Sequence, residues 1–214
     1  MWEENDINTY KSLTSHNLGQ ICNDGFSAEI TKYASDSNNN TFLEVGTWNG
    51  LGSTRAFARG IHNRDDCVFY SLECNKDKCE NAAKLYKNNS KIHILNEVIW
   101  NEEPEDFYTI FPQALSNKTY KHWNEVDIIN MKRCNLFLNR PDLPEIFDVV
   151  LLDGGEFTTY HEFQALKNRC KILMLDDINV DKCKLIVQEI ESDPSWTIIK
   201  KDNVRNGYLI AEKS

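Results

Sequence analysis

Acidic side chains recur along this chain at positions where buried strands are expected to end. They are Glu44, Glu73, Asp153, Asp176 and Asp177. In a sheet of parallel strands the carboxyl ends of neighbouring strands meet at one edge, and ligands bind there. Carboxylates brought together repel one another unless a cation or protons balance their charge. The spacing therefore predicts a site for a cationic group, either on a cofactor or as a metal ion.

A glycine-rich turn follows the first of these acids, in the segment FLEVGTWNGLGST. Its spacing, G-x-x-x-G-x-G, differs from the G-x-G-x-x-G of dinucleotide sites. A carboxylate at Glu44 would repel a pyrophosphate, whereas it suits an ammonium or sulfonium group. Because glycines let a ligand approach the backbone closely, we expect a cofactor to contact the turn residues Gly46, Thr47, Trp48, Asn49, Gly50 and Ser53. A tight bend without a ligand is the alternative, with Trp48 covering the sheet edge.

Three of the acids fall at the ends of two later strands. Asp153 ends one strand and the pair Asp176–Asp177 ends the next. Sites made of oxygen ligands favour Mg²⁺ or a similar hard ion, so these three carboxylates are candidate metal ligands. Alternatively, they cap the helices that follow or form a solvated turn.

Strands and helices alternate along the chain in the order that these sites require. Strands are expected at residues 41–45, 67–73, 91–95, 147–153, 171–177, 196–202 and 206–212, and helices at residues 27–35, 53–60, 76–88, 157–169 and 180–193. This alternation predicts an α/β fold with a parallel sheet and helices on both faces. A tight turn joins the last two strands, and such a turn connects antiparallel strands. The last strand is therefore expected to run against the others.

This order of elements, with the turn segment and Glu73, resembles the class I S-adenosylmethionine-dependent methyltransferases, which have a Rossmann-like doubly wound sheet. The resemblance implies that Glu44, the turn and Glu73 hold S-adenosylmethionine, with Glu73 on the two ribose hydroxyls. It places Asn96, directly after the third strand, at the adenine ring, and Asp153 beside the cofactor. A plain polar strand end is the alternative for Asn96.

The later acids resemble those of the small metal-dependent O-methyltransferases, of the macrocin and catechol types. This resemblance implies that Asp153, Asp176 and Asp177 bind Mg²⁺. The turn DGGE is similar to an Asp-Gly-x-His turn, with Glu156 in place of His, and the catechol type often has a lysine base at that position. The resemblance therefore leaves the catalytic base open among Asp153, Glu156 and His161. A purely structural histidine is the alternative for His161.

Residues 100–145 interrupt the alternation of strands and helices. They are rich in aromatic and charged side chains and contain four prolines. We expect an irregular, partly helical insertion within a single domain of residues 1–214. Its aromatic side chains form either a lid or substrate wall near the cofactor, or a satellite core or dimer interface.

Composition sets the remaining expectations. The net charge of −9 argues against nucleic-acid binding, which needs a basic face, and no apolar run is long enough to span a membrane. The N-terminus is polar and acidic, unlike a secretory signal, and the seven cysteines include no C-x-x-C pair. We therefore expect a cytoplasmic protein with reduced thiols.

The expected function is methylation of a small hydroxylated acceptor, with S-adenosylmethionine as cofactor and Mg²⁺ assisting. Such an enzyme holds the acceptor close and aligned, and a metal ion lowers the pKa of the acceptor hydroxyl. Two alternatives stay open: a non-catalytic binding module with this fold, and another nucleotide-dependent enzyme on a Rossmann-like sheet. A homodimer is the expected assembly.

Overall fold

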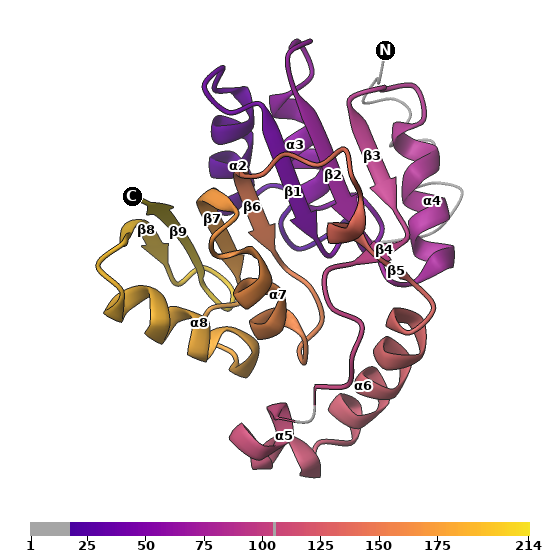
Figure 1. The fold of residues 1–214 in the computed structure, drawn as a ribbon, viewed down its shortest axis with the longest axis vertical. Helices are drawn as coiled ribbons and strands as arrows, with labels where there is room; N and C mark the ends of the chain where they lie inside the picture. The colour runs from indigo at the N-terminus through magenta and orange to yellow at the C-terminus, as the bar shows by residue number, and fades with distance from the viewer. Residues whose placement is uncertain (1–17, 105) are drawn as a thin grey trace. The chain divides into compact units, whose positions relative to one another are not determined.

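The computed structural model describes residues 18–104 and 106–214 (Figure 1). The chain divides into two compact units, a first unit that ends at Asn96 and a second unit that spans Glu97–Ser214. The expected single domain of residues 1–214 stays a prediction. The acidic N-terminal segment, on which the expected location partly depends, lies outside the described residues.

Within residues 18–96, the first unit is built on three parallel strands with three helices. The strands are β1(Thr41–Val45), β2(Val68–Leu72) and β3(Ile92–Leu95), in the order β3-β2-β1, and the helices are α2(Gly25–Ser35), α3(Ser53–Gly60) and α4(Lys76–Tyr86). The rings of Phe42, Phe57 and Phe69 pack together between β1, β2 and α3, with centroids 5.8 and 4.7 Å apart. All three rings are fully buried, so they form the centre of this unit's core.

Helix α2 begins two residues before the expected position. The carboxylate of Asp24 accepts a hydrogen bond from the Ser27 amide, at 2.8 Å, and so caps the helix. An aspartate at this position satisfies one of the amides that a helix start leaves without a partner. The cap therefore moves the helix start to Gly25.

The second unit contains four longer strands and two helices that pack against each other. The strands are β6(Phe147–Leu152), β7(Cys170–Asp176), β8(Trp196–Asp202) and β9(Tyr208–Lys213), in the order β6-β7-β9-β8, and the helices are α7(Thr159–Leu166) and α8(Asp181–Ser192). Strands β6 and β7 are parallel, whereas β9 runs antiparallel to both β7 and β8. The prediction of an antiparallel last strand is therefore confirmed.

The segment before β6 is partly helical, as expected. It contains α5(Phe107–Ile110), a 3₁₀ helix η1(Pro112–Ser116), α6(Lys118–Met131) and a second 3₁₀ helix η2(Phe137–Asn139), and its short strands β4(Glu97–Val98) and β5(Asn135–Leu136) pair in parallel. Phe107 and Ala114 pack with Phe157 in a small buried cluster. Part of this segment therefore forms a satellite core, which is one of the two roles expected for its aromatic residues.

Two features of the whole described chain bear on the remaining expectations. Among residues 18–104 and 106–214, no helix is both long and apolar enough to cross a membrane. The seven cysteines all lie in this part of the chain, and no pair of them forms a disulfide.

Candidate functional site

Strand register brings the predicted cofactor residues of the first unit to one edge. Val45 lies opposite Leu72 in the pairing of β1 with β2, and Leu72 lies opposite Leu95 in the pairing of β2 with β3. The residues that follow these three, Gly46, Glu73 and Asn96, therefore leave the sheet side by side. The sequence order of strands alone would not have fixed this alignment.

The turn after β1 has an unusual backbone. Gly46, Trp48 and Gly50 all have positive φ, at 105°, 51° and 73°. A left-handed backbone is rare for a residue as large as tryptophan and costs free energy. The Glu73 carboxylate holds it, because its Oε2 accepts a hydrogen bond from the Trp48 amide at 2.8 Å. Trp48 itself stays 44% exposed in this turn.

The amides of this turn bond within the first unit. Those of Gly46 and Thr47 both donate to the Leu72 carbonyl at 3.0 Å, and that of Gly50 donates to the Thr47 carbonyl at 2.9 Å. The Leu51 amide donates to the side-chain oxygen of Asn49 at 3.0 Å. A phosphate-binding loop instead aims a row of amides at its ligand. The amides of Gly46, Thr47, Gly50 and Leu51 are therefore not aimed at a ligand as in a pyrophosphate site.

Glu44 lies beneath the turn and has no exposed surface. Its Oε2 accepts hydrogen bonds from the hydroxyls of Thr54, at 2.7 Å, and Ser71, its register partner. Burial raises the pKa of Glu44, and the hydroxyls of Ser53, Ser71 and Thr54 lower it again in part. The Glu44 carboxylate is therefore enclosed in this conformation, and its expected contact with a cofactor cation stays a prediction.

Other polar side chains of the turn are also turned inward. Thr47, Asn49 and Ser53 are each at most 4% exposed, and the Thr47 hydroxyl bonds to that of Ser71. These side chains hold the turn itself, and contact of these residues with a cofactor stays a prediction. The backbone of the turn and the exposed Trp48 ring are left as its ligand-facing parts.

Glu73 and Asn96 stabilise the end of β2. The second carboxylate oxygen of Glu73, Oε1, accepts a hydrogen bond from the Asn75 amide at 2.8 Å. The Asn96 side-chain amide donates to the carbonyls of Glu73 and Cys74, at 2.8 and 2.9 Å. The Cys74 thiol donates to the same Oε1 of Glu73 at 3.8 Å. The roles of Glu73 at a ribose and Asn96 at an adenine stay predictions.

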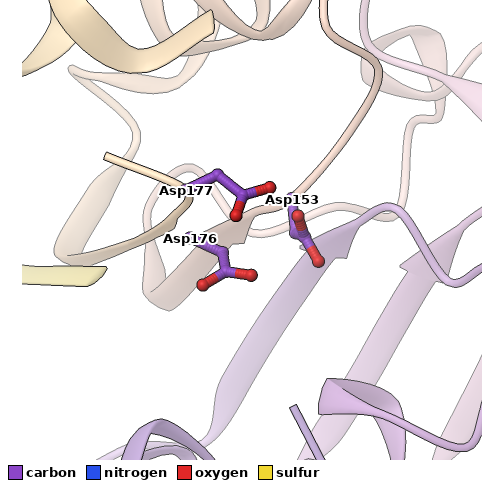
Figure 2. A group of neighbouring side chains, drawn as sticks. All are labelled: Asp153, Asp176 and Asp177. Carbon is purple, nitrogen blue, oxygen red and sulfur yellow. The ribbon is translucent and has the colours of Figure 1, made fainter. Parts of the chain in front are cut away.

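Register also explains the acid cluster of the second unit. Leu152 pairs with Leu175, which places Asp153 beside Asp176 at the ends of β6 and β7. Asp177 then turns back with a φ of 58°, a conformation that aspartate tolerates. One oxygen from each of the three carboxylates lies within 4.8 Å of the others, and Figure 2 shows the three groups gathered together. We call Asp153, Asp176 and Asp177 the acid cluster.

The capping alternative for these acids is wrong. The N-cap residue of α7 is Thr158 and that of α8 is Val180. Neither helix start has a capping hydrogen bond from a backbone amide to the side chain of its N-cap residue. The acid cluster instead contacts two cations. The Lys182 ammonium lies 3.1 Å from Asp153 Oδ1 and 3.0 Å from Asp177 Oδ2, and the Arg205 guanidinium lies 3.0 Å from Asp176 Oδ2.

Burial and charge act against each other on these groups. The pKa of Asp153 is raised to about 7, mainly by burial and also by the other two carboxylates, while the Lys182 ammonium acts to lower it. Burial likewise raises the pKa of Asp176. For Lys182, burial alone would lower the pKa, but Asp153 and Asp177 raise it well above its ordinary value. Lys182 is therefore a permanent cation inside the acid cluster.

The oxygen atoms of the acid cluster suit a divalent ion, but its carboxylate charges are already paired with side-chain cations. Its oxygen atoms are those that Mg²⁺ prefers, and Asp176 Oδ1 is buried with no hydrogen-bond partner among the described residues. However, the Lys182 ammonium already bridges Asp153 and Asp177. A metal ion at these oxygens would have to displace a side chain that is 3% exposed. The residues present therefore do not fit a bound Mg²⁺ in this conformation.

The two remaining candidates for the base differ sharply. His161 bonds to Asp106 through Nε2 at 3.0 Å and stacks on Trp100, which fits a structural role. Glu156 lines a surface hollow together with Lys182, and Phe107, Phe111, Phe157 and Tyr160 form apolar parts of its wall. Burial raises the pKa of Glu156, and its Oε2 has no hydrogen-bond partner among the described residues. Glu156 therefore has the properties of a base more clearly than His161.

The residues that sequence reasoning missed are the partners of the acids. Lys182 and Arg205 hold the acid cluster, and Ser71 and Thr54 hold Glu44. A signal for Lys182 was present, since a cation in the first turn of a helix is unfavourable unless acids compensate it. Nothing in the spacing pointed to Arg205, which comes from the turn between β8 and β9.

The fold that results is that of the class I methyltransferases. A mostly parallel sheet of seven strands with an antiparallel end and flanking helices is shared with the solved O-methyltransferases that match this chain, so the expected fold class is confirmed. No family model matches the chain, and no curated protein matches it in sequence. The likeness is therefore one of structure.

Three of the similar solved structures illustrate its extent. An O-methyltransferase from Bacillus cereus, in complex with SAH, has a TM-score of 0.64 and 11% identity, covering 99% of this chain and 92% of that chain. An O-methyltransferase of tomaymycin synthesis from Streptomyces achromogenes, in complex with SAM, has 0.62 and 12%, covering 99% and 90%. An SAH-bound methyltransferase from Podospora anserina has 0.61 and 10%, covering 99% and 88%.

Proposed function

We propose that this chain is an S-adenosylmethionine-dependent O-methyltransferase that acts on a small hydroxylated acceptor. One observation carries the proposal, beside the fold. Amides of the turn after β1 donate to carbonyls of the first unit, and the Glu73 carboxylate at the end of β2 accepts a hydrogen bond from the Trp48 amide. Such a turn offers its backbone and an exposed ring to a ligand without a phosphate group. S-adenosylmethionine has no phosphate and, when bound, supplies a methyl group on positively charged sulfur.

The acceptor side of the proposal concerns the second unit. An acceptor in the hollow beside Glu156 would lie against the apolar wall of Phe107 and Phe157. Glu156 then takes the proton of the acceptor hydroxyl, and the oxygen forms the bond to the methyl carbon. The carbon–sulfur bond breaks and its electron pair stays on sulfur. Holding the two reactants in line is the main contribution of the protein to such a transfer.

The mechanism described above does not use a metal ion bound to the acid cluster. Assistance by Mg²⁺ through Asp153, Asp176 and Asp177 stays a prediction that their charge partners oppose. A catalytic role of Asp153 or His161 also stays a prediction. We also propose a cytoplasmic location and a homodimer. The exposed apolar residues Trp123 and Ile129 on α6 fit a contact between copies.

Two other functions were expected as alternatives, and no observation favours either. Another nucleotide-dependent enzyme would bind a dinucleotide, which the internally bonded amides of the turn disfavour. A non-catalytic module with this fold would bind a cofactor or partner without turnover. Release of SAH from S-adenosylmethionine with a pool of hydroxylated acceptors separates the enzyme from such a module.

Calorimetric titration with SAH and with NAD tests the cofactor. We expect SAH to bind and NAD to give no heat of binding. The variant Trp48→Ala should bind SAH about tenfold more weakly, since one packed ring contributes roughly 1 kcal/mol or more. Trp123→Ala is the matched control, because Trp123 is as exposed as Trp48 but lies on α6. Binding of NAD in place of SAH would overturn the proposal.

A further inference from the structure

The position of Lys182 suggests what balances the acid cluster. Its ammonium touches Asp153 and Asp177 at 3.1 and 3.0 Å, and its side chain is 3% exposed. A buried ammonium is costly unless carboxylates surround it. The lysine is also the second residue of α8, where the positive end of the helix dipole repels a cation. The contacts with Asp153 and Asp177 therefore offset both the cost of burying the ammonium and its repulsion by the helix dipole.

Most of the negative charge of the acid cluster is already balanced by side-chain cations. Three carboxylates meet the ammonium of Lys182 and the guanidinium of Arg205, so one negative charge remains when all groups are ionised. Without Lys182 two negative charges would remain, and a divalent ion would cancel them. The ammonium and a divalent ion therefore compete for the same two carboxylates.

Lys182 also borders the hollow in which the proposed acceptor lies. The hollow is lined by Lys182, Glu156 and the rings of Phe107 and Phe157. An ammonium has three N–H donors. Among the described residues, Asp153 accepts one of them and Asp177 forms an ion pair with the ammonium at 3.0 Å. This leaves donor capacity for an oxygen atom of a bound molecule.

We propose that the Lys182 ammonium takes the place of a divalent ion in the acid cluster and donates a remaining N–H to the acceptor oxygen. This inference rests on the proposed function, which supplies the acceptor. In the transfer the acceptor O–H bond breaks, the proton passes to Glu156 and the oxygen bonds to the methyl carbon, whose bond to sulfur breaks with the electron pair left on sulfur. The ammonium keeps its protons and stabilises the developing negative charge on the oxygen. Methyl transfer by this chain therefore requires no metal.

The test measures the thermal stability of the full chain with Mg²⁺, Mn²⁺ or Ca²⁺ and with a chelator. For the wild-type protein we expect the same Tm in every condition. Lys182→Met keeps the length of the side chain and removes its charge. Its Tm should be lower without metal and should rise by roughly 3 °C or more at a metal concentration about ten times the Kd.

Two controls make the metal response specific. Lys184→Met removes a lysine from the same helix that is half-exposed and pairs with Asp181, so this variant should show no metal response. The double variant Lys182→Met/Asp177→Asn removes a carboxylate of the opened site and should lose the response of Lys182→Met. If Lys182→Met does not fold, titration calorimetry of the wild-type protein with each metal still tests the proposal, with no binding expected.

Specific outcomes would overturn the inference. Stabilisation of the wild-type protein by Mg²⁺, abolished by Asp153→Asn, would show a metal site and remove Lys182 from the role assigned here. A folded Lys182→Met with no metal response would show that the ammonium does not occupy a cation site. Titration with SAH separates the two proposals, since absence of SAH binding contradicts the proposed function and leaves the metal measurements valid.

Discussion

Two groups of buried acids in this protein are balanced in opposite ways. In the first unit, Glu44 and Glu73 accept hydrogen bonds from hydroxyl and amide groups, which have no net charge. In the second unit, Asp153, Asp176 and Asp177 contact the ammonium of a lysine and the guanidinium of an arginine. The same kind of side chain at the same kind of position, a strand end, therefore has two electrostatic environments.

The difference teaches which changes each region can tolerate. A carboxylate held by hydroxyls can take up a proton without leaving a charge unpaired, and burial already raises the pKa of Glu44. Protonation of a carboxylate held by a buried cation instead removes part of the charge that compensates the cation. We therefore expect loss of one partner to cost more in the acid cluster than beneath the turn.

The largest effect is expected for Lys182→Met. Breaking a buried ion pair by removing one partner costs about 3–5 kcal/mol. We expect about 3 kcal/mol in the free energy of unfolding at pH 8, because Asp153 and Asp177 keep 24% and 19% exposure. Denaturant unfolding measures it. A loss at pH 8 no larger than that of Ser71→Ala would contradict the comparison between the two regions.

The sequence predicted where the acids lie but not what balances them. Alternating elements and the apolar run before Asp153 were enough to place that residue at a strand end. The pairing of Leu152 with Leu175, which brings Asp153 beside Asp176, depends on long-range packing that no local pattern encodes. For the same reason Arg205, distant in sequence, could not be foreseen as the partner of Asp176.

The turn after β1 shows a second limit of sequence reasoning. Its glycine spacing indicated a tight bend correctly, with positive φ at Gly46 and Gly50. The pattern could not say whether Thr47 and Asn49 face a ligand or the interior. Both face the interior. The Thr47 hydroxyl bonds to the Ser71 hydroxyl, and the Asn49 side-chain oxygen accepts a hydrogen bond from the Leu51 amide.

The next effect concerns the pH dependence of stability. The pKa of Asp153 is about 7 in the folded chain and near 4 in an unfolded one, so the folded state holds a proton that the unfolded state releases in between. Stability should therefore fall as the pH rises from about 4 to about 7. Asp153→Asn should flatten this fall by about 2 kcal/mol in denaturant unfolding between pH 5 and pH 8.

Glu162 provides the comparison for that measurement. Burial raises its pKa to about 7 as well, and Thr158 is its hydrogen-bond partner at 3.0 Å. Glu162→Gln should flatten the pH dependence in the same direction, and the double variant should remove most of it. Stability that instead rises with pH across this window would contradict a raised pKa at Asp153.

A smaller effect is expected where hydroxyls hold a buried acid. Ser71→Ala removes the hydrogen bonds to Glu44 and to the Thr47 hydroxyl and leaves the bond from Thr54 to Glu44. Each hydrogen bond contributes about 1 kcal/mol, so we expect a loss of about 1–2 kcal/mol in denaturant unfolding. Ser35→Ala is the control, because the Ser35 hydroxyl bonds to a helix carbonyl at an exposed position. An equal loss in both variants would mean that the Glu44 contact adds nothing.

The smallest expected effect separates backbone strain from side-chain contact at Trp48. Glycine ordinarily lowers stability relative to alanine, by roughly 0.5–1 kcal/mol in regular structure. With a φ of 51° at Trp48 the order should reverse, because alanine keeps the cost of the left-handed backbone and glycine does not. We expect Trp48→Gly to be more stable than Trp48→Ala by about 0.5 kcal/mol, measured by denaturant unfolding. Both variants should lose SAH affinity alike, since both lack the ring. If alanine proves the more stable, the turn is not strained, and the clamp by Glu73 then has no strain to hold.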